Sequence, residues 1–261
     1  MRDISYINLV FTLFLLAIPI YASFKFNLKI AKKTLISTFR MIIQLFLIGI
    51  FLKFIFVKNS ILLNLLWLMI MITVASYTIT ESSSLKIKKF ILPTAASITV
   101  STFFIMFYFN KIILNLDNIF EAQYLIPIGG MLLGNSMRGN IIGISSFFKN
   151  LSKNEKSYLY SLSLGATKKE ALLPFIRESV LSSINPTLAS MATVGVISLP
   201  GMMTGQVIGG ADPMIAIKYQ IAIMIAIYVS STMSIVSVVY LSYRTCFDEY
   251  GLFKKDIMKK E

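Results

Sequence analysis

Long, continuously apolar blocks alternate with short polar segments along this chain of 261 residues. Each block holds about 20 residues, the length that an α-helix needs to cross about 30 Å of hydrocarbon. Membrane-spanning β-strands would instead alternate apolar and polar residues, which these blocks do not. The pattern predicts an all-α, polytopic membrane protein with about seven transmembrane helices, forming a single domain over residues 1–261. The expected spans are residues 6–24, 39–57, 61–80, 90–109, 124–148, 181–208 and 213–243.

Positive charge is divided unevenly among the polar segments between these spans. If the N-terminus lies outside the cell, 19 of the 25 Lys and Arg residues fall in or near the cytoplasmic segments, five fall in or near the outer segments, and Arg138 lies near the middle of a span. Cytoplasmic loops of membrane proteins carry such an excess. We therefore expect an outside N-terminus and an inside C-terminus. The net charge of +13 then reflects topology and anionic lipid headgroups, and nucleic acid is not an expected partner.

The composition excludes several kinds of chemistry. The chain has no histidine and a single cysteine, Cys246, so an internal disulfide is impossible and the commonest metal ligand and general base are missing. No Gly-x-x-x-x-Gly-Lys-Ser/Thr loop is present, so the chain is not expected to hydrolyse ATP or to hold a cofactor of its own. These absences favour a protein that is not an enzyme.

The longest cytoplasmic segment, at about residues 149–178, has the marks of two helices joined by a corner. Ser152 and Glu155 have capping-box spacing, which predicts a helix that starts there and ends near Leu164. Gly165 fits the left-handed residue that closes a helix. Thr167 and Glu170 form a second capping box.

The second box predicts a short helix over residues 168–173, which Pro174 then bends or ends. Each of the two helices has an apolar face, which either packs against the inner ends of the spans or docks into a partner. These faces comprise Tyr158, Leu159 and Leu162 on the first helix, and Ala171, Leu172 and Phe175 on the second.

Polar residues within the spans are candidates for function, because lipid makes their burial costly. Asn135 and Arg138 lie three residues apart on one helix face, among glycines that permit close helix approach. The alternative is that they hold helices together. In the sixth span, we expect residues 185–186 (Asn-Pro) and 199–201 (Leu-Pro-Gly) to break the helix, and broken helices at membrane depth are buried or line cavities.

Further candidates follow the second break. The thioethers of Met202 and Met203 suit Cu(I) better than hard cations, or they serve as pliable packing. Asp212, at the outer mouth, either attracts a cation or is a turn residue before Pro213. The sequence leaves the ligands of any metal open. The complete set of pathway candidates is Asn135, Arg138, Asn185, Met202, Met203, Thr204, Gln206, Asp212 and Gln220.

Three stretches carry a family resemblance. "LGATKKEALLPFIRESV" (164–180) looks like the coupling loop of ABC transporter permeases, which sits in a groove of the ATPase subunit, but it lacks the Glu-Ala-Ala opening of importer permeases. "MATVGVISLPGMMTGQVIGGADPMIAIKYQIAIM" (191–224) and "MLLGNSMRG" (131–139) resemble the FetB/YbbM-type permeases and the plant aluminium-tolerance half-transporters.

The resemblance implies the permease subunit of an ABC transporter that exports iron or a related metal species. ATP and Mg²⁺ would be used by a separate cytoplasmic ATPase subunit, and two permeases would pair with two ATPases. Contact with the ATPase would fall to Tyr158, Leu162, Gly165, Ala166, Thr167, Glu170, Ala171, Leu172 and Pro174. The cargo is open between a metal, a metal complex and a sugar nucleotide.

Two other classes of protein remain open. One is an ion-coupled secondary transporter. Such carriers usually bury acidic residues midspan and often contain inverted repeats, and this sequence shows no convincing buried carboxylate and no clear repeat, which counts against that class. The other is a membrane sensor or assembly factor that transports nothing.

Overall fold

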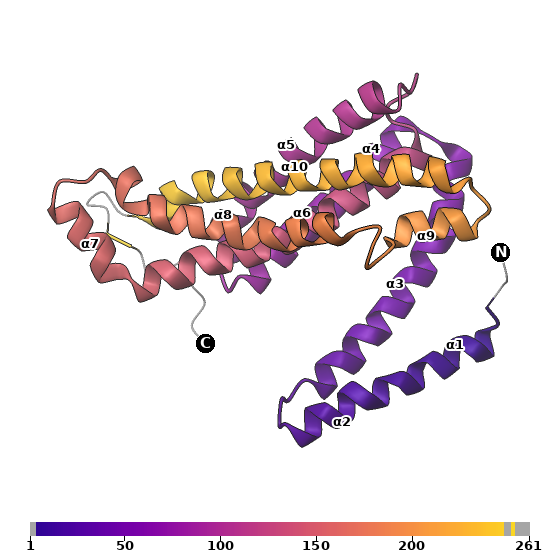
Figure 1. Cartoon of the computed structure of the whole chain (residues 1–261), viewed down its shortest axis with the longest axis horizontal. Helices are drawn as coiled ribbons and strands as arrows, with labels where there is room; N and C mark the ends of the chain where they lie inside the picture. Colours follow the sequence, from indigo (N-terminus) through magenta and orange to yellow (C-terminus); the bar gives the residue numbers. More distant parts are fainter. Residues whose placement is uncertain (1–3, 248–251, 254–261) are drawn as a thin grey trace. The chain divides into compact units, whose positions relative to one another are not determined.

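The computed structural model describes residues 4–247 and 252–253 of the chain. Within these ranges the protein is helical, with two isolated β-bridges, Val194 to Ser198 and Phe247 to Phe253 (Figure 1). The predicted all-α class is therefore confirmed. The helices form two compact units, one mainly of residues up to Asn59 and the other from Ser60 onward.

In the first unit, two apolar segments follow each other closely. The first comprises α1 (Tyr6–Leu13), the 3₁₀ turn η1 (Phe14–Leu16) and α2 (Ala17–Lys25), and the second is α3 (Ala31–Lys58), which packs against α2. The Ser23 hydroxyl joins them by accepting the N–H groups of Ile30 and Ala31, both at 3.1 Å. These donors at the start of α3 have no partner within the helix itself. Most large apolar side chains of this unit are exposed, as a lipid-facing surface requires.

The second unit is a bundle around one long helix. Its elements are α4 (Ile61–Ser82), α5 (Ile87–Tyr108) with the π-turn η2 (Phe109–Ile113), α6 (Ala122–Lys153), α7 (Glu155–Ser163), α8 (Lys168–Thr193), α9 (Gly201–Ile208) and α10 (Pro213–Cys246). Helix α6 packs against α4, α5, α8 and α10, so it forms the centre of the bundle.

Five stretches of the described chain are long and apolar enough to cross a membrane. They are Tyr6–Lys25, Ala31–Lys58, Ile61–Ser82, Ile87–Ile113 and Pro213–Ser242, and they match five of the seven expected spans. The remaining two expected spans correspond to α6 and to α8 with α9, which carry more polar residues. Five candidate spans are thus established, while the count of seven and the orientation of the termini stay predictions.

Two local expectations in the cytoplasmic segment were wrong. Ser152 caps no helix, because α6 runs past it to Lys153 and the N–H of Asn154 still donates to the carbonyl of Asn150 at 3.0 Å. Pro174 does not end a short helix, because α8 continues through it to Thr193. Burial of Leu172 and Phe175 on either side of Pro174 holds the segment helical in spite of the lost hydrogen bond.

The sixth expected span is broken once, not twice. Pro186 lies inside α8 without ending it, so the expected break at residues 185–186 was wrong. The second expected break is confirmed, since residues 194–200 are not helical and separate α8 from α9. Some glycines of α6 do permit close approach. A Cβ at Gly139 would lie 2.9 Å from Oγ of Ser183 on α8, and one at Gly129 would lie 3.0 Å from Cδ1 of Leu68 on α4, whereas no atom lies within 4 Å of a Cβ at Gly134.

Candidate functional site

The cytoplasmic corner between α7 and α8 has the geometry that its sequence predicts. Gly165 has a φ of +93°, which L-residues with a side chain rarely adopt. Its N–H donates to the carbonyl of Leu162 at 3.0 Å, and the N–H of Ala166 donates to the carbonyl of Ser161 at 3.1 Å. This pair of bonds is a Schellman motif, which closes α7 and turns the chain sharply into α8. We call α7, residues 164–167 and the first two turns of α8 the elbow.

A reciprocal capping box fixes the other side of the corner. The N–H and the hydroxyl of Thr167 donate to Oε2 of Glu170 at 2.8 and 2.7 Å, and the N–H of Glu170 donates to Oγ1 of Thr167 at 3.3 Å. The bond from the Thr167 hydroxyl, and then that from its N–H, hold the pKa of the Glu170 carboxyl below its ordinary value of 4.5. The start of α8 is therefore a defined point and not a frayed end.

Several residues expected to meet a partner lie instead inside the bundle. Tyr158, Ala171 and Leu172 are buried, and the Tyr158 ring packs 5.5 Å from that of Phe247. Leu162 and Ala166 are half-buried, whereas the remaining candidates are exposed: Gly165, Thr167, Glu170 and Pro174. For the three buried side chains, packing against the bundle is the alternative that the structure shows.

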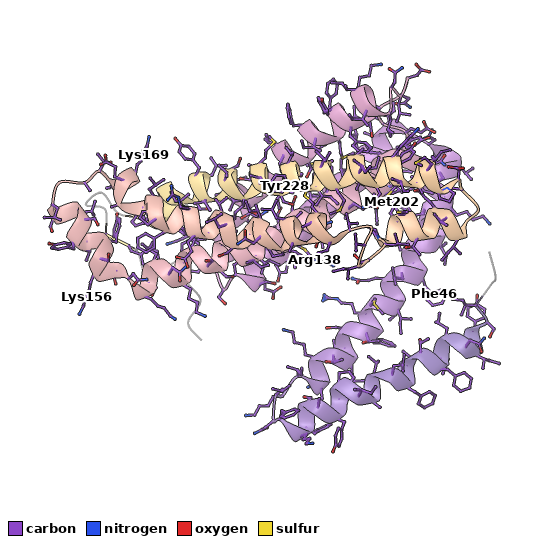
Figure 2. All side chains as sticks on the ribbon, in the orientation of Figure 1. Phe46, Arg138, Lys156, Lys169, Met202 and Tyr228 are labelled. Carbon is purple, nitrogen blue, oxygen red and sulfur yellow. The ribbon has the colours of Figure 1, made fainter. Side chains whose placement is uncertain are left out.

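The exposed apolar surface of the elbow comes from residues that sequence reasoning passed over. Tyr160, Leu164 and Leu173 are 66%, 71% and 57% exposed. We call these three the elbow tip. Figure 2 shows Lys156 and Lys169 projecting outward from the same end of the bundle. A signal was available, because Tyr160 and Leu164 are four residues apart and so share a face distinct from that of Tyr158.

A groove of about 550 Å³ opens between α6, α8, α9, α10 and the non-helical residues 194–200. Val194, Ser198 and Pro200 bring the non-helical backbone to its wall. Irregular backbone is tolerated at membrane depth where it lines a cavity, so this arrangement fits the expectation from the broken span. In Figure 2, Arg138 and Met202 lie along the bundle away from the elbow.

The structure brings together four of the nine pathway candidates in this groove: Asn135, Arg138, Met202 and Gln220. The other five, Asn185, Met203, Thr204, Gln206 and Asp212, are not part of its lining. Asp212 instead caps α10, where its Oδ1 accepts the N–H groups of Met214 and Ile215 at 2.8 and 3.2 Å. Of the two alternatives for Asp212, the turn and cap role is the one observed.

Small polar residues on α8 complete the groove, and sequence reasoning did not single them out. Ser183, Thr187 and Ser190 all line it. They are spaced four and three residues apart, which is the repeat of one helix face. This spacing could be read from the sequence. Serine and threonine are common in membrane helices, however, so the spacing alone is weak evidence for a binding site.

A buried polar seam runs from the groove between α6 and α10. The side-chain amide of Asn140 donates to Oγ of Ser234 and to the carbonyl of Ser136, both at 2.7 Å. The hydroxyls of Ser136 and Ser230 lie 3.3 Å apart. Such hydrogen bonds hold membrane helices together. Asn140 thus serves the structural role that we also considered for the polar residues of α6.

The groove offers poor ligands for a bare metal ion. Among the residues that the structure describes, no group of three Cys, Asp or Glu side chains is close enough to hold a metal. Cys246 is buried away from the groove and its thiol donates to the carbonyl of Ser242 at 2.9 Å. Among the side chains of the groove, any metal would meet amide, hydroxyl and thioether groups, beside the guanidinium of Arg138.

Comparison with known proteins places the chain among membrane proteins. The family described as "Uncharacterised protein family (UPF0014)" matches residues 6–247. The "Probable iron export permease protein FetB" of Escherichia coli is 33% identical over 95% of this chain and 94% of its own. "Protein ALUMINUM SENSITIVE 3" of Arabidopsis thaliana is 33% identical over 88% of this chain and 83% of its own. "UPF0014 membrane protein YjkA" of Bacillus subtilis is 29% identical over 97% and 99%. No solved structure matches the chain.

Proposed function

Because this chain belongs to the UPF0014 family of membrane proteins, we propose that it is the permease subunit of an ABC transporter that exports iron or a related metal species. The relative named as a probable iron export permease aligns with nearly its whole length, so the likeness covers groove and elbow alike. The chain has no nucleotide-binding motif of its own. Energy would therefore come from ATP and Mg²⁺ on a separate cytoplasmic ATPase subunit.

One observation carries this proposal: the elbow tip presents exposed apolar side chains on a rigid, doubly capped corner. A polar-bordered apolar patch on a fixed corner suits insertion into the groove of a partner protein. The buried side chains of the same elbow, among them Tyr158 and Leu172, join it firmly to the bundle. Motion imposed on the tip would then reach the helices that line the groove.

The working complex would contain two copies of this permease and two ATPases in the inner membrane of a bacterial cell. The excess of Lys and Arg in the elbow and in the other segments placed inside supports an outside N-terminus and a cytoplasmic elbow. In this arrangement α6 supplies the fifth crossing and the pair α8–α9 supplies the sixth. Arg138 and Ser183 line the groove and Asn140 bonds across the seam, so these polar groups need not face lipid.

Single charges placed on the elbow tip test the proposal. We expect Leu164→Asp to abolish ATP-dependent iron transport into inside-out vesicles that contain the permease and its ATPase, because a carboxylate cannot enter an apolar groove without a large desolvation cost. Leu164 packs into no core, so the variant should insert and fold normally. Ser163→Asp is the matched control, since it adds the same charge one residue away on an exposed side chain.

Two results would contradict the proposal. One is full transport by Leu164→Asp, which would remove the elbow tip from the coupling path. The other is transport at the full rate by the permease without any ATPase, which would favour an ion-coupled carrier.

A further inference from the structure

Among the described residues that line the groove, one is charged, and it is a cation. Arg138 stands among amide, hydroxyl, thioether and aliphatic side chains, with no Asp or Glu in this part of the lining. No hydrogen bond or ion pair joins its side chain to any residue that the structure describes. A site shaped to hold a bare metal cation would have the opposite charge.

The position of Arg138 makes this charge costly. It is near the middle of α6, which spans Ala122–Lys153, and therefore far from both ends of the expected crossing. Charged side chains at that depth in a membrane protein almost always pair with another group or face a water-filled cavity. Here it faces the groove, and none of the described residues that line the groove carries a negative charge.

Two neutral polar side chains in the same wall also have atoms without a hydrogen-bond partner among the described residues. The side chains of Ser183 and Gln220 are 2% and 7% exposed, and Oγ of Ser183 and Oε1 of Gln220 have no hydrogen-bond partner among the described residues. Buried polar atoms are almost always hydrogen-bonded in folded proteins. Both residues line the groove beside Arg138, so a bound molecule with oxygen acceptors and a hydroxyl or amide donor would satisfy them.

We infer that the molecule bound in the groove carries an anionic carboxylate or phosphate group, which pairs with Arg138. The inference rests on the proposed function and specifies its cargo class: the metal would leave the cell as an anionic complex and not as a bare cation. A guanidinium binds both carboxylate and phosphate through two parallel hydrogen bonds. Ser183 and Gln220 would bind the neutral polar atoms of the same complex.

Binding to the permease alone tests this inference separately from transport. The protein is placed in nanodiscs of phosphatidylcholine, and equilibrium dialysis measures binding of radioactive ferric citrate, of citrate alone and of Fe²⁺. We expect ferric citrate to bind, Arg138→Gln to weaken it about 10- to 100-fold, and Arg138→Lys to weaken it less, because lysine keeps the charge but loses the paired hydrogen bonds. Arg177→Gln is the control, because Arg177 is an exposed arginine on α8 outside the groove.

Several binding results would overturn the inference. Preferential binding of Fe²⁺ over the anions, or equal binding by the wild type and Arg138→Gln, would remove Arg138 from cargo recognition, as would binding of none of the probes. A second arm adds phosphatidylglycerol to the nanodiscs. If Arg138 retains that lipid and binds no chelate, its counter-ion is a lipid headgroup and the assignment to cargo fails. Chelate binding without ATP-dependent transport would instead leave this inference standing and refute the proposed function.

Discussion

Replacing Gly143 with alanine tests how closely α6, α8 and α10 meet. A Cβ at this position would lie 2.6 Å from Cδ1 of Ile235 on α10 and 3.0 Å from Cβ of Ser183 on α8. Real Cβ atoms essentially never show a contact of 2.6 Å, so Ile235 must move, and the 3.0 Å contact is also tighter than usual. Ile235 is 0% exposed and Ser183 is 2% exposed, which leaves little space for such a movement.

Two opposing free-energy contributions determine how much Gly143→Ala changes the stability of the protein. Overpacking a well-filled interior costs about 1–3 kcal/mol. Replacing glycine by alanine within a helix contributes about 0.5–1 kcal/mol in the other direction, because the unfolded chain loses conformational freedom. The steric term is the larger at this position, so we expect Gly143→Ala to lower the free energy of unfolding by about 1–2 kcal/mol.

Reversible unfolding in mixed detergent micelles, followed by circular dichroism during titration with dodecyl sulfate, measures this difference. Gly134→Ala is the matched control on the same helix, because no atom lies within 4 Å of a Cβ placed there. The control has only the favourable term, so its stability should be unchanged or slightly higher.

A second substitution identifies the clashing atom. Ile235→Val removes Cδ1 and alone should cost about 0.5–1.5 kcal/mol. Combined with Gly143→Ala it should cost somewhat less than the sum of the two, because the clash with Cδ1 is removed while Cγ1, 2.9 Å from the new Cβ, stays in place. A Gly143→Ala protein as stable as the Gly134→Ala control would refute the close approach of the three helices.

Three further predictions concern the elbow and the polar seam. Gly165→Val should lower the free energy of unfolding of the purified protein by about 1–2 kcal/mol in a thermal melt, and Gly165→Asn should lower it by less, because residue 165 has a φ of +93°. Thr167→Ala should cost about 1 kcal/mol and speed hydrogen exchange in the first turn of α8. Acid should also speed hydrogen exchange in this turn, after correction for the intrinsic exchange rate. The pKa of the Glu170 carboxyl is lowered in the folded protein, so the carboxylate stabilises the turn above pH 4.5 and loses this effect as the pH falls through the folded-state pKa. Asn140→Ala should cost about 0.5–1.5 kcal/mol in the same detergent titration, because two hydrogen bonds are lost.

Features that depend on neighbouring residues alone were predictable from the sequence. The capping box of Thr167 and Glu170, the left-handed Gly165 and the five strongly apolar helices all follow from short-range rules, and the structure confirms them. The family resemblance was likewise confirmed, because it rested on long stretches such as residues 191–224 and not on a single motif.

Features set by tertiary packing were not predictable in this way. The Ser152–Glu155 spacing satisfies the capping-box rule, yet α6 continues through Ser152, since the burial of Leu151 favours further helix. Two prolines lie inside α8 where a local rule predicts its end. Buried residues flank Pro174 on both sides, whereas at Pro186 the buried residues Ser183 and Ile184 lie only before it. The same packing decided which apolar residues of the elbow are exposed, so Tyr158 lies inside and Leu164 outside.

The corrected course of α8 bears most directly on the proposed coupling. A break at Pro174 would have separated the elbow from the groove by a flexible joint. The helix instead runs without interruption for 26 residues, about 39 Å, from the capping box at Thr167 to Thr193. Its first turns belong to the elbow, and Ser183, Thr187 and Ser190 on its later turns line the groove. A displacement at the elbow would therefore move one wall of the groove through a continuous helix. Pro174 and Pro186 are the two places where this helix lacks a backbone hydrogen bond and bends most easily.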